Sequence, residues 1–159
     1  MDSGKIKTRS ALIRILNKLR NKKVVFTNGC FDILHYGHIK YLEGAKRLGD
    51  ILVVGLNSDS SVKKIKGRAR PIIKQFDRAR ILAGLASVDY VTIFNGDTPE
   101  ALIKSVRPDV LVKGGDWRED EIVGAKCVAS YGGEVIAIPY IKGRSTSGII
   151  DKIRRTARS

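Results

Sequence analysis

Two histidines separated by two residues stand between a short apolar run and a stretch of helical character. His35 and His38 follow residues 24–26, which are typical of a strand, and precede the helix-like residues 39–48. Residues three apart lie on the same side of a helical turn. The first turn of a helix carries unpaired N–H groups and a partial positive charge, and parallel strands bind ligands where they end. This pattern predicts that residues 27–38 bind phosphate.

The other residues of this segment suit a close approach of phosphates to the backbone. Gly29 permits that approach, and Cys30 and Phe31 would present their N–H groups, with the Phe31 ring in the core. Asp32 is suited to cap the turn and to orient the loop. The histidines have two alternatives, a structural pair or part of a zinc site. Zinc usually needs three protein ligands, and only Cys30 or Asp32 lies close in sequence.

Three further segments combine glycines with cations or hydroxyl groups. Residues 63–71 hold five cations, one glycine and one proline, which predicts a basic loop that reaches the phosphates or is simply solvated. Gly114 and Gly115 predict a tight turn after a strand. The hydroxyl groups of residues 145–147 would cap the start of a helix, or leave its N–H groups free to bind phosphates.

The elements that position these segments alternate between strands and helices. We predict strands over 24–27, 51–56, 90–94, 110–112 and 135–138, and helices over 39–48, 75–86, 99–106, 119–131 and from about 145 onward. The strands are rich in Val and Ile and mostly lack polar alternation, as in a sheet covered on both faces. The expected fold is α/β: a Rossmann-like, doubly wound, five-stranded parallel sheet with helices on both faces, in a single domain.

Residues 1–22 are expected to form a segment of their own ahead of the main domain at 23–159. A basic amphipathic helix is predicted over 5–22, where Leu12, either Ile15 or Leu16, and Leu19 recur at helical spacing with cations opposite. The apolar stripe would pack on the domain or on a partner subunit. Attachment to a membrane surface is a weaker alternative because the stripe is short.

The composition is that of a globular protein with an unusual charge. The 159 residues are 43% hydrophobic and 29% charged, and the formal net charge is +14. This charge suits either nucleic acid or small anionic substrates, but much of it lies at the chain ends and no aromatic-rich strand offers base stacking. No specific nucleic-acid partner and no membrane partner is expected. Without an apolar signal region, and with Cys30 and Cys127 expected as free thiols, a cytoplasmic location is predicted.

The ordered motifs resemble one branch of the HxGH nucleotidyltransferase superfamily, which includes cytidylyltransferases and phosphopantetheine adenylyltransferase. The series comprises residues 29–38, 57–59, 66–67, 70–71, 97–99, 111–117, 132–135 and 145–147. It is similar to the adenylyltransferase domain of bacterial ADP-heptose synthases over residues 23–155. Many members of that branch carry a fused sugar kinase, so a stand-alone form of the nucleotidyltransferase domain is expected here.

The resemblance implies a role for each segment. It assigns catalysis to His35, His38 and Lys66, with the histidines stabilising the transition state and no covalent enzyme intermediate. Nucleotide binding would involve both histidines and also Thr27, Asn28, Gly29, Cys30, Phe31, Lys113, Gly114, Ser145, Thr146 and Ser147. Substrate binding would involve Asp32, Arg78, Asp116 and Trp117. Mg²⁺ would be bound through the ATP phosphates, and no residue is expected to ligate a metal.

Some of these roles have structural alternatives. Arg78 could equally make a structural ion pair, Trp117 could be a buried core residue, and Asp32 could serve only the turn. Residues 140–143 depart from the arginine-threonine-glutamate-glycine stretch of many cytidylyltransferases. This departure argues against a glycerol-phosphate cytidylyltransferase.

The activity implied by the resemblance is transfer of AMP from ATP to a sugar 1-phosphate, with D-glycero-β-D-manno-heptose 1-phosphate as the expected acceptor. ADP-heptose for lipopolysaccharide or a surface glycan would form with pyrophosphate, by direct in-line displacement at the α-phosphate. Such a step needs positioning and charge stabilisation more than covalent help. Two alternatives stay open: a cytidylyltransferase acting on a polyol or amino-alcohol phosphate, and a basic nucleic-acid-binding module. A homodimer is expected by family analogy.

Overall fold

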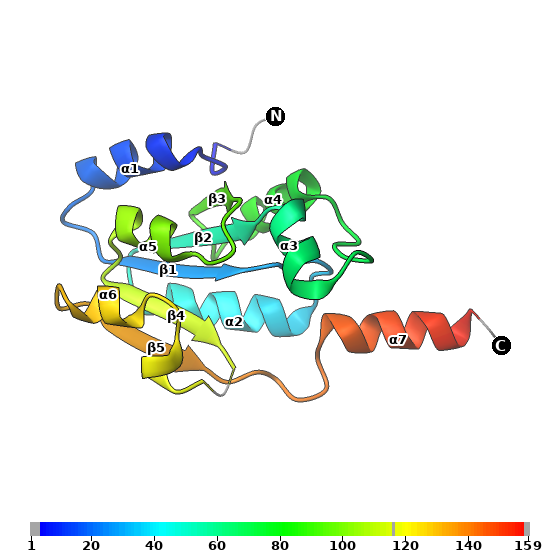
Figure 1. Cartoon of the computed structure of the whole chain (residues 1–159). Helices are drawn as coiled ribbons and strands as arrows, with labels where there is room; N and C mark the ends of the chain where they lie inside the picture. The colour runs from blue at the N-terminus through cyan, green and yellow to red at the C-terminus, as the bar shows by residue number, and fades with distance from the viewer. Residues whose placement is uncertain (1–3, 116, 158–159) are drawn as a thin grey trace.

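Five parallel strands form the centre of the structure, a computed structural model that describes residues 4–115 and 117–157 (Figure 1). They are β1 (Val24–Gly29), β2 (Ile51–Asn57), β3 (Tyr90–Phe94), β4 (Val110–Gly114) and β5 (Glu134–Ile138). Their order is β3-β2-β1-β4-β5, and each neighbouring pair is parallel. The chain first builds outward from β1 to β3 and then returns to β1's other side with β4. The carboxyl ends of β1 and β4 therefore flank the switch point where such sheets bind ligands.

Helices cover both faces of the sheet, which confirms the predicted doubly wound fold. On one face lie α2 (Tyr36–Lys46) and α4 (Gln75–Ala83), and on the other α1 (Arg9–Lys18), α5 (Glu100–Val106) and α6 (Ala125–Ala129). Successive residues of a strand point to opposite faces. Accordingly Val25 packs among the residues of α2 and α4, whereas Phe26 packs among those of α1 and α5.

The N-terminal helix is shorter than the 5–22 expected. Ile6 instead makes a parallel bridge to Val91 of β3, and α1 begins at Arg9 after the N-cap Thr8. The apolar stripe lies on the domain, where Leu12 and Leu16 are buried in the core. The division of the chain after residue 22 stays a prediction.

The basic run 63–71 is only partly the loop that was predicted. Its first residues belong to α3 (Asp59–Lys66), and the loop begins at Gly67. The Ser58 hydroxyl caps the start of the helix by accepting a hydrogen bond from Ser61 N. Burial of Val62 stabilises the helix against the rest of the domain. The prediction of a loop over 63–66 is wrong because capping and burial outweigh the crowding of like charges.

The prediction of one helix over 119–131 is also wrong. The segment instead forms the 3₁₀ turn η1 (Glu119–Glu121) and the separate helix α6. Gly124 separates them with a φ of +94°. A Cβ at this position would lie 2.6 Å from Ile103 Cδ1, and the positive φ is strained for a residue with a side chain, so glycine suits the junction between η1 and α6.

The last helix, α7 (Thr146–Thr156), extends away from the carboxyl edge of the sheet (Figure 1). Within the described part of the chain none of its residues is buried. None of the helices in 4–115 and 117–157 has both the length and the apolar character that crossing a bilayer requires.

Candidate active site

The two histidines stack on each other at the start of α2. His35 is the N-cap residue, and its ring centroid lies 4.0 Å from that of His38, with an interplanar angle of 28°. The Phe31 ring lies 5.3 Å from the His38 ring. Among the residues that the structure describes, neither histidine has a hydrogen-bond partner for its buried Nδ1. A buried nitrogen without a partner is costly, and ligand binding would relieve that cost.

Both imidazoles are neutral at neutral pH. Burial, with a contribution from His35, lowers the pKa of His38 to about 4. Burial, with a contribution from Arg144, also lowers the pKa of His35. A neutral imidazole keeps one N–H donor and one acceptor nitrogen, so the stacked pair can donate to phosphate oxygens without two like charges in contact.

The first turn of α2 is open to a ligand. Its N-cap His35 makes no side-chain capping bond within the described residues, so N–H groups of the first turn are left for another acceptor. A Cβ on Gly37 would lie 3.0 Å from the His35 ring and 3.2 Å from Arg144 Cβ. Glycine therefore leaves room between the two histidines for the His35 ring and Arg144.

The backbone before this turn is strained. Phe31 is buried and adopts a φ of +42°, which is rare for a residue with a side chain. A Cβ on Gly29 would lie 3.0 Å from the Phe31 ring, so this glycine makes room for the ring. Strain of this kind persists where the surrounding structure fixes it, and such positions cluster at functional sites.

Asp32 fastens this segment to the loop that follows α3. Its buried carboxylate accepts hydrogen bonds from Ile73 N at 2.8 Å, Ile72 N at 2.9 Å and Arg70 Nε at 2.5 Å. Burial alone would raise the pKa of Asp32, but the two amides and the guanidinium outweigh it and lower that pKa. The geometry agrees with the predicted role of orienting the loop, and the predicted substrate contact stays a prediction.

Arg78 is fully buried beneath the same loops. It donates to the carbonyl oxygens of Ile73, at 2.9 Å, and Cys30, and it pairs with Asp59 at 2.9 Å. The alternative of a structural ion pair is thus present, and a direct role of Arg78 in substrate binding stays a prediction. Its guanidinium also fixes the position of the Cys30 carbonyl, and Cys30 is one of the residues predicted to bind the nucleotide.

Lys66 and Lys113 approach Cys30 from two different elements, the end of α3 and the end of β4. Burial lowers the pKa of Lys113, with Cys30 opposing and Lys66 adding to the shift. Burial raises the pKa of the Cys30 thiol, with Lys66, Arg78 and Lys113 opposing. The structure therefore brings together three predicted segments that are far apart in the sequence. Two cations beside the β1 loop are suited to bind phosphate oxygens.

The turn after β4 carries two aromatic rings. A Cβ on Gly115, which has a φ of +119°, would lie 3.0 Å from both Trp117 Nε1 and Tyr140 Cε2. Trp117 Nε1 donates to Gly114 O at 3.1 Å, and the residue is 49% exposed. The core alternative for Trp117 is therefore wrong, and its ring is open to a ligand. Asp116 lies outside the described residues.

The hydroxyl segment 145–147, which caps and begins α7, contacts the loop after β1. Ser145 caps the helix by accepting from Gly148 N at 3.1 Å, and Thr146 Oγ1 donates to Ile33 O at 3.2 Å. The predicted cap is confirmed at Ser145. Ser147 is exposed, and phosphate binding by these hydroxyls stays a prediction.

Thr27 and Asn28 precede the glycine at the end of β1. The Thr27 hydroxyl bonds with that of Tyr41 at 2.5 Å, and Tyr41 donates to Val112 O at 3.2 Å. The Thr27 side chain therefore links β1, α2 and β4 in the interior, and a role of Thr27 in nucleotide binding stays a prediction. Asn28 is half-buried near the end of the strand.

Three residues near the site were not among the predicted ones. Arg70 holds Asp32, Tyr140 packs at the turn after β4, and Arg144 approaches His35 and Gly37. Arg144 directly precedes the hydroxyl segment, which is a signal that sequence reasoning could have used. Arg70 lies in the predicted basic loop 63–71, whereas Tyr140 carries no such signal, because its relevance arises from contacts between distant loops.

Acidic and metal-ligating side chains are dispersed around the site. In residues 4–115 and 117–157, no three His, Cys, Asp or Glu side chains lie close enough to hold a metal ion. The Asp32 carboxylate is already occupied by three donors.

Comparison with known families agrees with this geometry. The family described as Cytidylyltransferase-like matches residues 26–150, from β1 through the first turns of α7. The chain belongs to the cytidylyltransferase-like family. This finding confirms the family expected from the HxGH box and the motifs that follow it.

Relatives within the cytidylyltransferase-like family extend over nearly all of this chain. The chain is 55% identical to the bifunctional protein HldE of Geobacter metallireducens over 154 residues, and 57% identical to that of Campylobacter concisus over 150 residues. These matches cover 96% and 94% of this chain but 31% of each relative. The chain thus spans about a third of the length of these relatives.

Solved structures agree with the fold. A lipopolysaccharide core biosynthesis protein from Thermoplasma volcanium is 32% identical, with a TM-score of 0.61 over 77% of this chain and 99% of that one. A pantoate-beta-alanine ligase from Francisella tularensis has a TM-score of 0.61 over 97% of this chain and 79% of that one. At 17% identity, the ligase shows a shared fold only.

Proposed function

We propose that this protein is a nucleotidyltransferase that transfers AMP from ATP to a sugar 1-phosphate and releases pyrophosphate. The acceptor is D-glycero-β-D-manno-heptose 1-phosphate, and the product is an ADP-heptose for lipopolysaccharide or a surface glycan. The observation that carries the proposal is the stacked, neutral pair of His35 and His38, whose buried nitrogens lack partners among the described residues. The resemblance to the adenylyltransferase domain of ADP-heptose synthases, and the identity to HldE proteins, support the choice of substrates.

The reaction follows from the arrangement of donors. An oxygen of the sugar 1-phosphate attacks the α-phosphorus of ATP, a new P–O bond forms, and the bond to pyrophosphate breaks on the opposite side. His35 and His38 donate hydrogen bonds to the phosphoryl oxygens as their charge increases. The N–H groups of the first turn of α2 add to this stabilisation. Lys66 and Lys113 neutralise the substrate phosphates, which would otherwise repel each other.

Mg²⁺ enters this proposal as part of the ATP substrate. Mg²⁺ commonly binds through substrate phosphates and a few carboxylates and keeps several waters. The three donors already bound to Asp32 support the view that the phosphates supply the ligands. The metal would add charge neutralisation at the leaving pyrophosphate.

We further propose a cytoplasmic homodimer. Free thiols at Cys30 and Cys127 suit a reducing compartment in which ATP is available. Ile153 of α7 is 58% exposed, and no residue of this helix is buried within the described chain. This exposed apolar side chain supports a second copy of the chain as the partner that covers α7. Light scattering across a concentration series tests the dimer.

The test of function is pyrophosphate release with Mg²⁺, crossing ATP and CTP against sugar 1-phosphates, glycerol 3-phosphate and phosphopantetheine. Turnover with ATP and the heptose 1-phosphate alone is the expected result. Turnover with CTP and an alcohol phosphate would retain the histidine chemistry and replace the substrates by those of a cytidylyltransferase. No turnover by folded protein, together with salt-sensitive binding of nucleic acid, would favour the binding-module alternative.

A further inference from the structure

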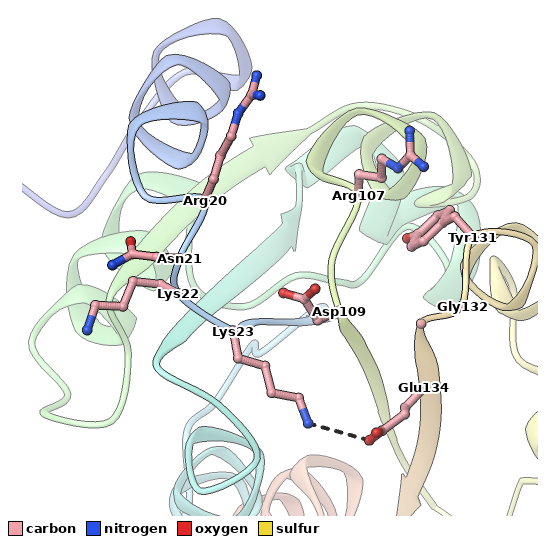
Figure 2. A pocket seen from close by; sticks show the side chains of 10 residues that line it. Arg20, Asn21, Lys22, Lys23, Arg107, Asp109, Tyr131, Gly132 and Glu134 are labelled. Carbon is pink, nitrogen blue, oxygen red and sulfur yellow. Dashed lines mark ion pairs between the residues drawn. The ribbon is translucent and has the colours of Figure 1, made fainter.

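A hollow of about 470 Å³ lies at the amino edge of the sheet, where β1, β4 and β5 begin. Figure 2 shows the side chains around it, and we call it the amino-edge pocket. The cations that line it are Arg20, Lys22, Lys23 and Arg107. The histidine pair follows β1's other end, so this pocket is separate from the candidate active site.

The pocket contains more positive than negative charge. Its two carboxylates are already engaged, since Asp109 Oδ2 accepts from Val24 N at 2.7 Å and Glu134 pairs with Lys23 at 3.6 Å (Figure 2). Arg20 and Lys22 have no carboxylate partner in the described ranges, 4–115 and 117–157. Cations brought together without counter-charges attract anions.

Arg107 is held in place at the rim. It ends α5 in a left-handed conformation, with a φ of +52°, which arginine adopts at a cost of about 1 kcal/mol. Its guanidinium carbon lies 4.8 Å from the centroid of the Tyr131 ring, and Tyr131 in turn donates to Pro108 O at 3.1 Å. Burial raises the pKa of Tyr131 to about 12, so its hydroxyl stays neutral and cancels none of the positive charge.

We propose that the amino-edge pocket binds a small phosphorylated metabolite, at a site distinct from the one that carries the proposed function. Its volume lies within the range of pockets for small ligands. Arginine and lysine donate short, charge-assisted hydrogen bonds to phosphate oxygens, and arginine can present two donors to one phosphate. Arg20, Lys22 and Arg107 line the pocket from two segments that are remote in sequence.

The proposal is tested by ¹⁵N NMR titration of the full chain with inorganic pyrophosphate at low salt. The amides of Gly132 and Gly133 report on the amino-edge pocket, and those of Gly29 and Gly37 report on the candidate active site. We expect saturable shifts at Gly132 and Gly133. If the proposed function were wrong, the shifts of Gly132 and Gly133 would still be expected, because they do not depend on the candidate active site. The two proposals can therefore fail independently.

Matched variants distinguish a built site from diffuse attraction. Arg20→Ala with Lys22→Ala should weaken the response of Gly132 and Gly133 at least about tenfold. Arg14→Ala with Lys18→Ala removes the same charge from outside the pocket and should leave that response within about twofold.

Arg107→Gly provides a second test, because glycine suits the left-handed backbone and should preserve the fold. It should also weaken the response severalfold. Equal weakening by the Arg14/Lys18 control, or shifts that never saturate, would overturn the proposal. Tighter binding of a short single-stranded oligonucleotide, with shifts continuing along α1, would replace it by a nucleic-acid surface.

Discussion

The loop after β1 and the segment after β5 both reach the candidate active site, yet they are held in different ways. Buried groups fix the first, because the Asp32 carboxylate accepts three donors and Arg78 bonds to the Cys30 carbonyl. The second is tied to that loop by the Thr146 hydroxyl and continues into α7, which buries no residue in the described chain.

This difference suggests that the two segments of the candidate active site have different roles. The β1 loop is organised before a ligand arrives, so little reorganisation is needed when charge develops on the phosphoryl group. The β5 segment has few contacts to lose and is free to adjust around a bound substrate or a second subunit. Changes on the β1 side should therefore affect chemistry and stability more strongly than changes on the β5 side.

The largest expected effect is on turnover. His38→Ala should lower the rate of pyrophosphate release by a factor on the order of 100 to 1,000, because a donor to the transition state is lost. Ser147→Ala on the β5 side should lower it less than about tenfold. Circular dichroism verifies that both variants are folded. Similar losses from the two changes would contradict the proposed asymmetry.

The next effect is on stability. Arg78→Met should lower the free energy of unfolding by about 3 kcal/mol, because it leaves the Cys30 and Ile73 carbonyls and the Asp59 carboxylate without their donor. Arg68→Met, on the exposed loop after α3, should change it by less than about 0.5 kcal/mol. Urea unfolding measures both, and an Arg78→Met variant as stable as the parent would show that the β1 loop is not held by this side chain.

A smaller effect should appear with pH. The folded-state pKa of His38 is lowered to about 4, so between its ordinary value of 6.5 and about 4 the unfolded chain binds the extra proton. Stability therefore falls as the pH drops through that window, by at most about 2 kcal/mol at pH 5 from this group. The lowered pKa of His35 acts in the same direction.

Urea unfolding at pH 7 and pH 5 tests this sign. His38→Gln removes the titrating group and should reduce the loss between the two pH values. A loss that is unchanged in His38→Gln would mean that other groups cause it. Asp32 acts outside this window, because its lowered pKa gives stability that is lost only as the pH falls through the folded-state value.

The smallest effect on monomer stability should come from α7. Ile153→Glu should change the free energy of unfolding of dilute protein by less than about 0.5 kcal/mol, since the side chain is 58% exposed. In concentrated solution the same change should lower the dimer fraction seen by light scattering. A dilute protein that is strongly destabilised would show that α7 is part of the monomer's own core.

The sequence predicted the sheet well because its strands are buried on both faces. Val and Ile runs such as 51–56 leave little choice of structure, and all five strands appear within a few residues of their predicted bounds. Helices whose sequences combine conflicting signals were harder to predict. In α3 the Ser58 cap outweighs a cationic run, and the glycine at position 124 separates η1 from α6 where periodicity alone predicts one continuous helix.

The site was predictable in its motifs and less so in its supports. The histidines and the glycine between them lie within one short segment, so their proximity follows from the sequence. Full burial of Arg78 does not follow from local sequence, because its partners Cys30, Asp59 and Ile73 come from three separate segments. Such contacts depend on how the loops meet above the sheet, which no local pattern encodes.

The central position of β1 has a consequence for synthesis of the chain. β1 pairs with β2 soon after it is made, but its other neighbour, β4, is about 85 residues further along. Until β4 leaves the ribosome, the apolar strand Val24–Gly29 has one row of unpaired amides and carbonyls, the kind of edge at which nascent chains associate. Docking of β4 is a late, long-range event, and it completes the proposed phosphate site and removes that unpaired edge in the same step.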